Sequence, residues 1–184
     1  MYALLKLAKE NNLEKVFIHL VLDGRDVPEK SALKYLEQLE IKIEEIGIGK
    51  IATVTGRYFT MDRDTNWDRT KAAYDLMTFG KGFRATSAEE AIESAYERGI
   101  KTDYYVDPTV INDENEEAIG LIKDEDSLIW FNFRTDRSRQ IAAMFCKLGL
   151  CPTEFQGEIN PYFVGMCRYD ESWNLPVALF AVNY

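Results

Sequence analysis

The sequence is poor in the residues that build metal centres and nucleophilic sites. It contains one histidine, His19, and three cysteines, Cys146, Cys151 and Cys167, with no C-x-x-C pair. A transition-metal site needs several such ligands, so we expect no metal site within this chain. We predict that the cysteines are reduced thiols, and that His19 is a hydrogen-bonded residue of a strand rather than a ligand or base.

Common signals of nucleotide binding, hydrolysis and membrane insertion are also missing. The sequence has no G-x-x-x-x-G-K-[ST], G-x-G-x-x-G or G-x-S-x-G motif, which excludes the standard phosphate-binding loops and the serine nucleophile elbow. No apolar run approaches the roughly 20 residues that cross a bilayer, and the first residues do not resemble a signal peptide. The net charge of −9 argues against nonspecific binding to nucleic acid or membrane. We therefore expect a cytoplasmic protein.

The hydrophobic pattern predicts strands that alternate with helices. Apolar runs indicate buried strands, and helical spacing indicates helices that begin and end at capping residues. The predicted strands cover residues 16–22, 51–55, 127–133 and 162–167, and the predicted helices cover 31–46, 66–79, 87–98 and the segment after 134. Residues 104–111 are predicted to be an edge or irregular segment because of Pro108, and 176–184 to be extended. This order predicts a three-layer α/β/α sandwich with a mainly parallel, or mixed, central sheet in one domain over residues 1–184.

A first amphipathic helix is already under way at Met1, with no capping residue before it. We therefore expect that Met1 is not the natural start of the protein.

Three predicted strands are each followed by arginine and aspartate. The segments are Leu22-Asp23-Gly24-Arg25-Asp26-Val27-Pro28, then 56–64, then 134–139. Because the carboxyl ends of parallel strands lie at one edge of a sheet, the three segments can converge there. The planar fork of arginine binds phosphate or carboxylate in a bidentate manner. For one segment alone, surface salt bridges between its arginines and aspartates explain the pattern equally well; the three together favour an anion-binding site.

Arg137 adds an argument from helix electrostatics. It falls near the first turn of its predicted helix, where the helix dipole disfavours a cation by about 0.3–1 kcal/mol. A bound anion would offset that cost, since each charge-assisted contact contributes about 1.5–3 kcal/mol. Asp26 is a possible proton carrier. Because no nucleophile accompanies these groups, the chain resembles half of an active site.

The motifs carrying these residues resemble those of cofactor-independent phosphoglycerate mutases. They are Leu22-Asp-Gly-Arg-Asp26, Gly56-Arg-Tyr58 with Met61-Asp-Arg-Asp64, and Phe131-Asn-Phe-Arg134 with Asp136-Arg137. They follow the order of the family and nearly its spacing, from about residue 16 to 139. The resemblance implies a two-domain enzyme that interconverts 3-phosphoglycerate and 2-phosphoglycerate through a phosphoserine. It implies that this chain is the inserted substrate-binding domain, and that a phosphatase-like domain carries the serine and two manganese ions.

The resemblance also assigns roles to individual residues. The implied substrate-binding residues are Arg25, Asp26, Arg57, Arg63, Arg134 and Arg137. The arginines would hold the carboxylate and phosphate of the substrate, and Asp26 would handle the proton of its hydroxyl group. The phosphorylated serine of the family, its metal ligands, its histidine-containing substrate loop and its phosphate-binding lysine have no counterpart here. We therefore predict that this chain, expected to be a monomer, does not catalyse the mutase reaction unaided.

Two other interpretations belong to different functional classes. The chain would act as a stand-alone module that binds a phosphorylated metabolite without chemistry if it were a complete natural protein. Alternatively, its acidic surface would dock a partner, and such binding would weaken at high salt.

Overall fold

The computed structural model describes residues 1–178. Its helices are α1 (Tyr2–Glu10), α2 (Ala32–Ile46), α3 (Arg57–Thr60), α4 (Trp67–Phe79), α5 (Ala88–Glu97) and α6 (Thr135–Phe145), with short 3₁₀ turns η1 (Asp103–Tyr105) and η2 (Thr153–Phe155). Its strands are β1 (Phe17–Leu22), β2 (Lys50–Gly56), β3 (Phe83–Ala85), β4 (Thr109–Ile111), β5 (Ser127–Trp130) and β6 (Tyr162–Gly165). Along the described part of the chain, no helix is both long and apolar enough to span a membrane.

The strands form two sheets. The larger has the order β1-β2-β4-β3, with β1 parallel to β2, β3 parallel to β4, and β2 antiparallel to β4. The smaller pairs β5 with β6 in parallel. The predicted α/β class with mostly parallel strands is confirmed, and the single antiparallel pairing makes the larger sheet mixed.

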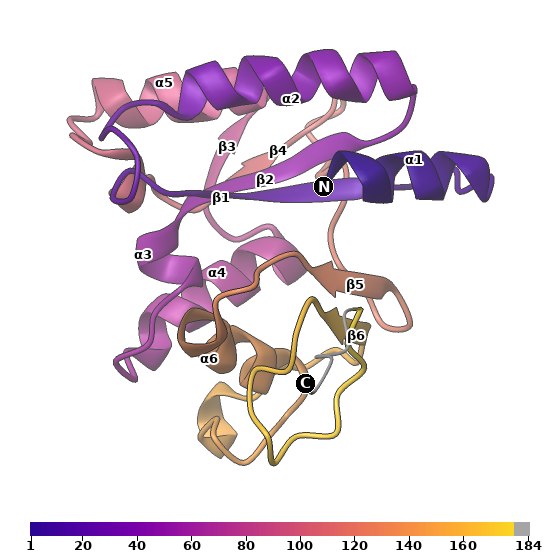
Figure 1. Ribbon diagram of the computed structural model, residues 1–184. Coiled ribbons are helices and arrows are strands. Elements are labelled where there is room, and N and C mark those ends of the chain that lie inside the picture. The colour runs from indigo at the N-terminus through magenta and orange to yellow at the C-terminus, as the bar shows by residue number, and fades with distance from the viewer. Residues whose placement is uncertain (179–184) are drawn as a thin grey trace.

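Helices cover both faces of the larger sheet (Figure 1). Helices α2 and α5 pack on one face, where Leu36, Val54 and Ile92 belong to a cluster of buried apolar side chains that we call the sheet core. Helix α4 lies on the other face and also packs against α6. Beyond it, Tyr74 and Phe145 belong to a second cluster, the helix core, which includes side chains of β5 and β6.

Two predictions about strands were wrong. The first strand, predicted to be buried, is β1 at the edge of its sheet, where its side chains are half-buried or exposed. The segment 127–133, predicted to be a strand of the same central sheet, forms β5 of the smaller sheet and ends at Trp130. An apolar run in the sequence indicates that a segment will be buried, but it does not indicate which strand will pair with that segment.

The segment 104–111 also differs from its prediction. Its first residues form η1, and its last three form β4, which lies inside the larger sheet between β2 and β3 rather than at an edge. Pro108 precedes β4, so its missing N–H interrupts no pairing of that strand. The predicted extended end is described only to residue 178, where Val177 forms an isolated bridge with Gly165; residues 179–184 lie outside the described part.

His19 and the cysteines occupy the positions expected of them. His19 Nδ1 lies 2.9 Å from Thr53 Oγ1 on the neighbouring strand, and burial lowers the pKa of the imidazole to about 4. All three cysteines are free thiols, and burial raises the pKa of Cys146 and of Cys151 to about 11. These groups are therefore neutral at pH 7 and take no part in the charge balance of the site described next.

Candidate anion-binding site

The first two arginine loops leave the larger sheet side by side. Strands β1 and β2 are parallel, and Leu22 is the register partner of Gly56, so the loop that follows β1 and helix α3 begin at the same edge. Gly24, with φ of +59°, and Gly56 both pack against the turn η1. A Cβ at Gly24 would lie 2.5 Å from the Tyr104 nitrogen, and one at Gly56 would lie 2.3 Å from the Tyr104 oxygen. Only glycine fits this close approach, which aligns the two loops.

Arg57 joins the two loops through ion pairs. Its Nη1 atom donates to Asp23 Oδ1 at 2.6 Å and to Asp26 Oδ2 at 2.7 Å, while its side chain is only 4% exposed. The hydrogen bond and the charge of Arg57 lower the pKa of Asp26 below its usual range. Asp26 is therefore ionised at neutral pH, with a side chain that is 61% exposed and open to a ligand.

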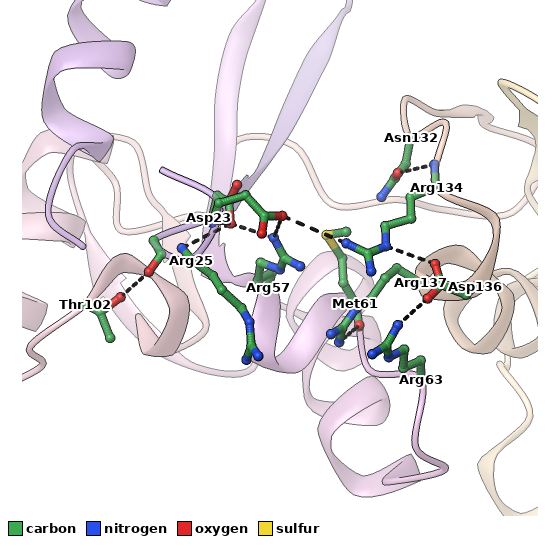
Figure 2. Close-up of polar contacts among 12 residues, drawn as sticks. Asp23, Arg25, Arg57, Met61, Arg63, Thr102, Asn132, Arg134, Asp136 and Arg137 are labelled. Carbon is green, nitrogen blue, oxygen red and sulfur yellow. Dashed lines mark hydrogen bonds and ion pairs between the residues drawn. The ribbon is translucent and has the colours of Figure 1, made fainter. Parts of the chain in front are cut away.

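The third loop reaches the same place from the other sheet (Figure 2). Arg134 Nη1 lies 3.9 Å from Asp26 Oδ2, and Arg134 Nε donates to Asp136 Oδ1 at 2.9 Å. The other oxygen of Asp136 accepts a 2.6 Å hydrogen bond from Arg63. Partial burial would raise the pKa of Asp136, but the hydrogen bonds from Arg63 and Arg134 outweigh it and lower the pKa to about 2.

Arg137 is the most buried cation of this third loop. This residue is 7% exposed, its guanidinium donates to the Met61 carbonyl at 2.9 Å, and its Nε has no hydrogen-bond partner among the described residues. Within residues 1–178, no carboxylate forms an ion pair with it. A buried cation satisfied only by one neutral carbonyl is costly, and an anion bound beside it would relieve that cost.

Helix α6 also fixes the loop that carries Arg63. Gln140 on α6 donates to the buried carboxylate of Asp62 at 3.0 Å and accepts from the Thr65 backbone at 2.9 Å. Asp62 in turn accepts from the backbone N–H groups of Asp64 and Asn66. The loop is thus held by contacts that do not involve Arg63 itself.

Ion pairs join four of the six predicted site residues, Asp26, Arg57, Arg63 and Arg134, into one network that includes Asp23 and Asp136. Arg137 lies beside this network and donates to the Met61 carbonyl of the loop that carries Arg63. Arg25 is outside the network: in the described structure it forms no ion pair, and its guanidinium carbon lies 5.7 Å from the centre of the Tyr104 ring. It is exposed at the rim of the network and free to reach a ligand.

The local charge is opposite to that of the whole protein. The five arginines at the site, Arg25, Arg57, Arg63, Arg134 and Arg137, bring five positive charges against the three negative charges of Asp23, Asp26 and Asp136, which leaves two in excess. A phosphate monoester carries about −1.5 to −2 at pH 7. The group therefore matches a phosphorylated ligand in charge, and the arginine forks supply donors in excess of those already used.

Comparisons with known proteins identify the family of this chain. The family model described as "BPG-independent PGAM N-terminus (iPGM_N)" matches residues 1–171. The chain belongs to this family. It is 50% identical to 2,3-bisphosphoglycerate-independent phosphoglycerate mutase 1 of Methanosarcina acetivorans, over 97% of this chain and 35% of the relative. It is 45% identical to the 2,3-bisphosphoglycerate-independent phosphoglycerate mutase of Acetivibrio thermocellus, again over 98% of this chain and 35% of that protein.

A solved structure of the same kind has the same fold. Leishmania mexicana phosphoglycerate mutase, crystallised at low cobalt concentration, matches with a TM-score of 0.86 at 29% identity. The match covers 92% of this chain and 32% of that one. The chain thus spans about a third of the length of the family members it matches, at 35% of the first relative.

The family resemblance implies metal ions, but the described part of this chain contains no set of residues arranged to bind them. Residues 1–178 contain no group of three or more His, Cys, Asp or Glu side chains arranged to hold a metal ion. The acidic residues at the site, Asp23, Asp26 and Asp136, are each engaged by arginine. These carboxylates are therefore held by arginine and form no group of metal ligands within residues 1–178.

Sequence reasoning missed three contributors to the site of this family member. Asp23 and Asp136 stand within the motifs, but they appeared there as surface partners of arginine rather than as members of the network. No motif in the sequence indicated that the turn η1 contributes to the site. Its Asp103 is 1% exposed and accepts from the backbone of Ser31 and Ala32, at the start of α2, and only the folded chain brings these positions together.

Proposed function

We propose that this chain is the substrate-binding domain, over residues 1–184, of a phosphoglycerate mutase that interconverts 3-phosphoglycerate and 2-phosphoglycerate. The observation that carries the proposal is that three loops bring together five arginines, Arg25, Arg57, Arg63, Arg134 and Arg137, against three aspartates, an excess of two positive charges. The family membership supplies the reaction, since the relatives that match 97% of this chain are named as mutases. A module that binds a phosphorylated metabolite without chemistry is not favoured, because the relatives that match this chain are named as enzymes.

Each residue has a role in this proposal. Arg25, Arg57, Arg63, Arg134 and Arg137 hold the carboxylate and the phosphate of the substrate, while Asp26 exchanges a proton with its hydroxyl group. Asp26 is ionised at neutral pH because of Arg57, which is the state that a proton acceptor requires. Its lowered pKa makes it a weak base, so closing of the site around the substrate, with loss of water, would strengthen it.

The remaining chemistry is assigned to a second, phosphatase-like domain that completes the active site. In this proposal that domain supplies the phosphorylated serine and two manganese ions. The Leishmania mexicana enzyme was crystallised with cobalt, which supports a divalent metal in the family without specifying manganese. We propose that the protein acts as a monomer in the cytoplasm and binds neither nucleic acid nor membrane, in keeping with its net charge of −9.

Calorimetric titration of 3-phosphoglycerate into this chain tests the proposal. Glycerate, which lacks the phosphate, is the matched ligand, and Arg84→Ala is the matched variant. Arg84 carries the same charge on β3, at the opposite edge of the larger sheet from β1, and within residues 1–178 it donates only to the Glu116 carbonyl. We expect saturable binding of 3-phosphoglycerate that Arg134→Ala weakens about tenfold or more and Arg84→Ala leaves unchanged. Equal binding of both ligands, or equal loss in both variants, would contradict it.

A further inference from the structure

We propose that Asp136 is a built-in counter-ion that lowers the affinity of the site for simple inorganic anions, and so favours ligands with two anionic groups. The inference rests on the proposed function, because it concerns how the same arginines choose their ligand.

The geometry of Asp136 is that of a bound carboxylate ligand. One oxygen accepts from Arg134 Nε at 2.9 Å, and the other accepts from Arg63 Nη1 at 2.6 Å (Figure 2). The two arginines come from different loops, one following β2 and one following β5. Asp136 therefore fills the space where two guanidinium groups face each other, with the charge and the acceptor pattern that an anion would bring.

A tethered carboxylate competes with a free anion at an advantage. Asp136 is held in place by helix α6, so it pays no cost of association each time it binds, whereas a dissolved anion does. Its negative charge also reduces the attraction that Arg63 and Arg134 exert on any further anion nearby. Inorganic phosphate must overcome both effects with a single anionic group.

A ligand with two anionic groups has additional partners. Arg137 lies on the same helix turn as Asp136 but has no carboxylate partner among residues 1–178. Arg25 is likewise unpaired within that range. A phosphorylated acid can bind these cations and the Arg63–Arg134 pair at once. The additional contacts offset the competition from the Asp136 carboxylate, which inorganic phosphate cannot offset. Selectivity is the difference between the affinities for two ligands, and Asp136 lowers the affinity for inorganic phosphate more than the affinity for a phosphorylated acid.

Removing the Asp136 charge leaves the surrounding structure in place. The side chains of Asp136, Arg63 and Arg134 are each 43% exposed, so no buried charge is stranded. The Arg63 loop is held separately by the Asp62–Gln140 hydrogen bond. The effect of the substitution on anion binding can therefore be measured on a folded chain.

The experiment compares Asp136→Asn with Asp170→Asn in calorimetric titrations of inorganic phosphate and of 3-phosphoglycerate. Asp170 lies 3.7 Å from Arg139, another arginine of α6, so both variants raise the net charge by one unit and remove a carboxylate near that helix. We expect Asp136→Asn to bind inorganic phosphate about tenfold more tightly than the native chain, and Asp170→Asn to match the native chain. The gain for 3-phosphoglycerate should be smaller, so the ratio of the two affinities falls. Asp136→Glu, which keeps the charge, should bind phosphate as weakly as the native chain.

Phosphate binding to Asp136→Asn that is absent, unchanged or weaker overturns the proposal, and so does an equal gain in Asp170→Asn. Asp136→Ser removes the same charge with a smaller side chain and provides a second measurement of the same effect. If the native chain prefers 3-phosphoglycerate no more than phosphate, while Asp136→Asn still gains on phosphate, the counter-ion role stands, but the preference for ligands with two anionic groups and the proposed function both fail.

Discussion

Arg57 and Asp26 form a 2.7 Å ion pair although 31 positions separate them in the sequence. Each follows a strand of the larger sheet, and the parallel pairing of those strands brings the two loops together. The pair leaves Asp26 exposed and Arg57 buried, so the cation is fixed while the carboxylate faces solvent. This is the arrangement that a site needs when the arginine orients the ligand and the carboxylate exchanges a proton with it.

Arg57→Ala should abolish anion binding and destabilise the chain. The substitution removes the partner of Asp23 and Asp26 and leaves two adjacent carboxylates uncompensated, which should lower the free energy of unfolding by about 1–3 kcal/mol. Urea denaturation measures the stability, and titration with 3-phosphoglycerate measures the binding. Arg84→Ala, with the same charge change, is the control. Native-like binding by Arg57→Ala would show that the buried arginine has no part in the site.

Gly24→Ala and Gly56→Ala should each be destabilising by about 1–3 kcal/mol. A Cβ at either position meets the backbone or side chains of η1 within 2.6 Å, and Gly24 also has a positive φ. Gly149→Ala is the control, because a Cβ there meets nothing within 4 Å. Thermal denaturation of the three variants should separate the first two from the third. Equal melting temperatures would mean that η1 does not set the positions of the two loops.

Asp103→Asn should lower the free energy of unfolding by about 1–3 kcal/mol. One carboxylate oxygen of Asp103 accepts from the Ser31 and Ala32 backbone at 2.8 and 2.9 Å, and the other accepts from the Tyr96 hydroxyl. An amide would present an N–H₂ group to one of these donors. Asp113→Asn makes the same change in an exposed turn and should alter stability by no more than about 0.5 kcal/mol. Similar losses in both variants would rule out a special role for the buried carboxylate.

His19 should make the stability of the chain depend on pH. Its pKa is about 4 in the folded chain against 6.5 for the ordinary imidazole, so below pH 6.5 the unfolded state binds more protons than the folded state. Stability is therefore fully present above pH 6.5 and falls toward pH 4, by at most about 2 kcal/mol at pH 5. Urea denaturation of the native chain and of His19→Gln at pH 7 and 5 measures this. The same pH dependence in both would assign it to other groups.

The sequence predicted individual helices and strands more accurately than it predicted which strands pair with one another. The helical spacing of the apolar residues and Gly47 at the end placed α2 correctly, because those signals act within a few residues. The pairing of strands depends on contacts between distant segments, so the edge position of β1 and the separate sheet of β5 could not be seen. The three loops nevertheless lie together, because α6 packs on α4 and Arg137 near the start of α6 donates to the Met61 carbonyl.

The residues of the site also differ in how far the sequence could predict them. Because arginine binds anions through its planar fork, residue type and position indicated the three arginine-rich segments, and the family resemblance then singled out Arg57, Arg63, Arg134 and Arg137 within them. Whether a nearby aspartate pairs with an arginine or stands apart depends on side-chain geometry. For that reason the bridging position of Asp136 and the support that Asp103 gives to the loops became visible only in the fold.

The central claim, that three loops form one anion site, is tested most directly by the nuclear magnetic resonance signals of the arginine Nε–H groups during titration with 3-phosphoglycerate. We predict that the signals of Arg57, Arg63, Arg134 and Arg137 shift together and follow one dissociation constant, while the signal of Arg84 stays in place. Shifts confined to the arginines of a single loop, or a different dissociation constant for each loop, would contradict the claim.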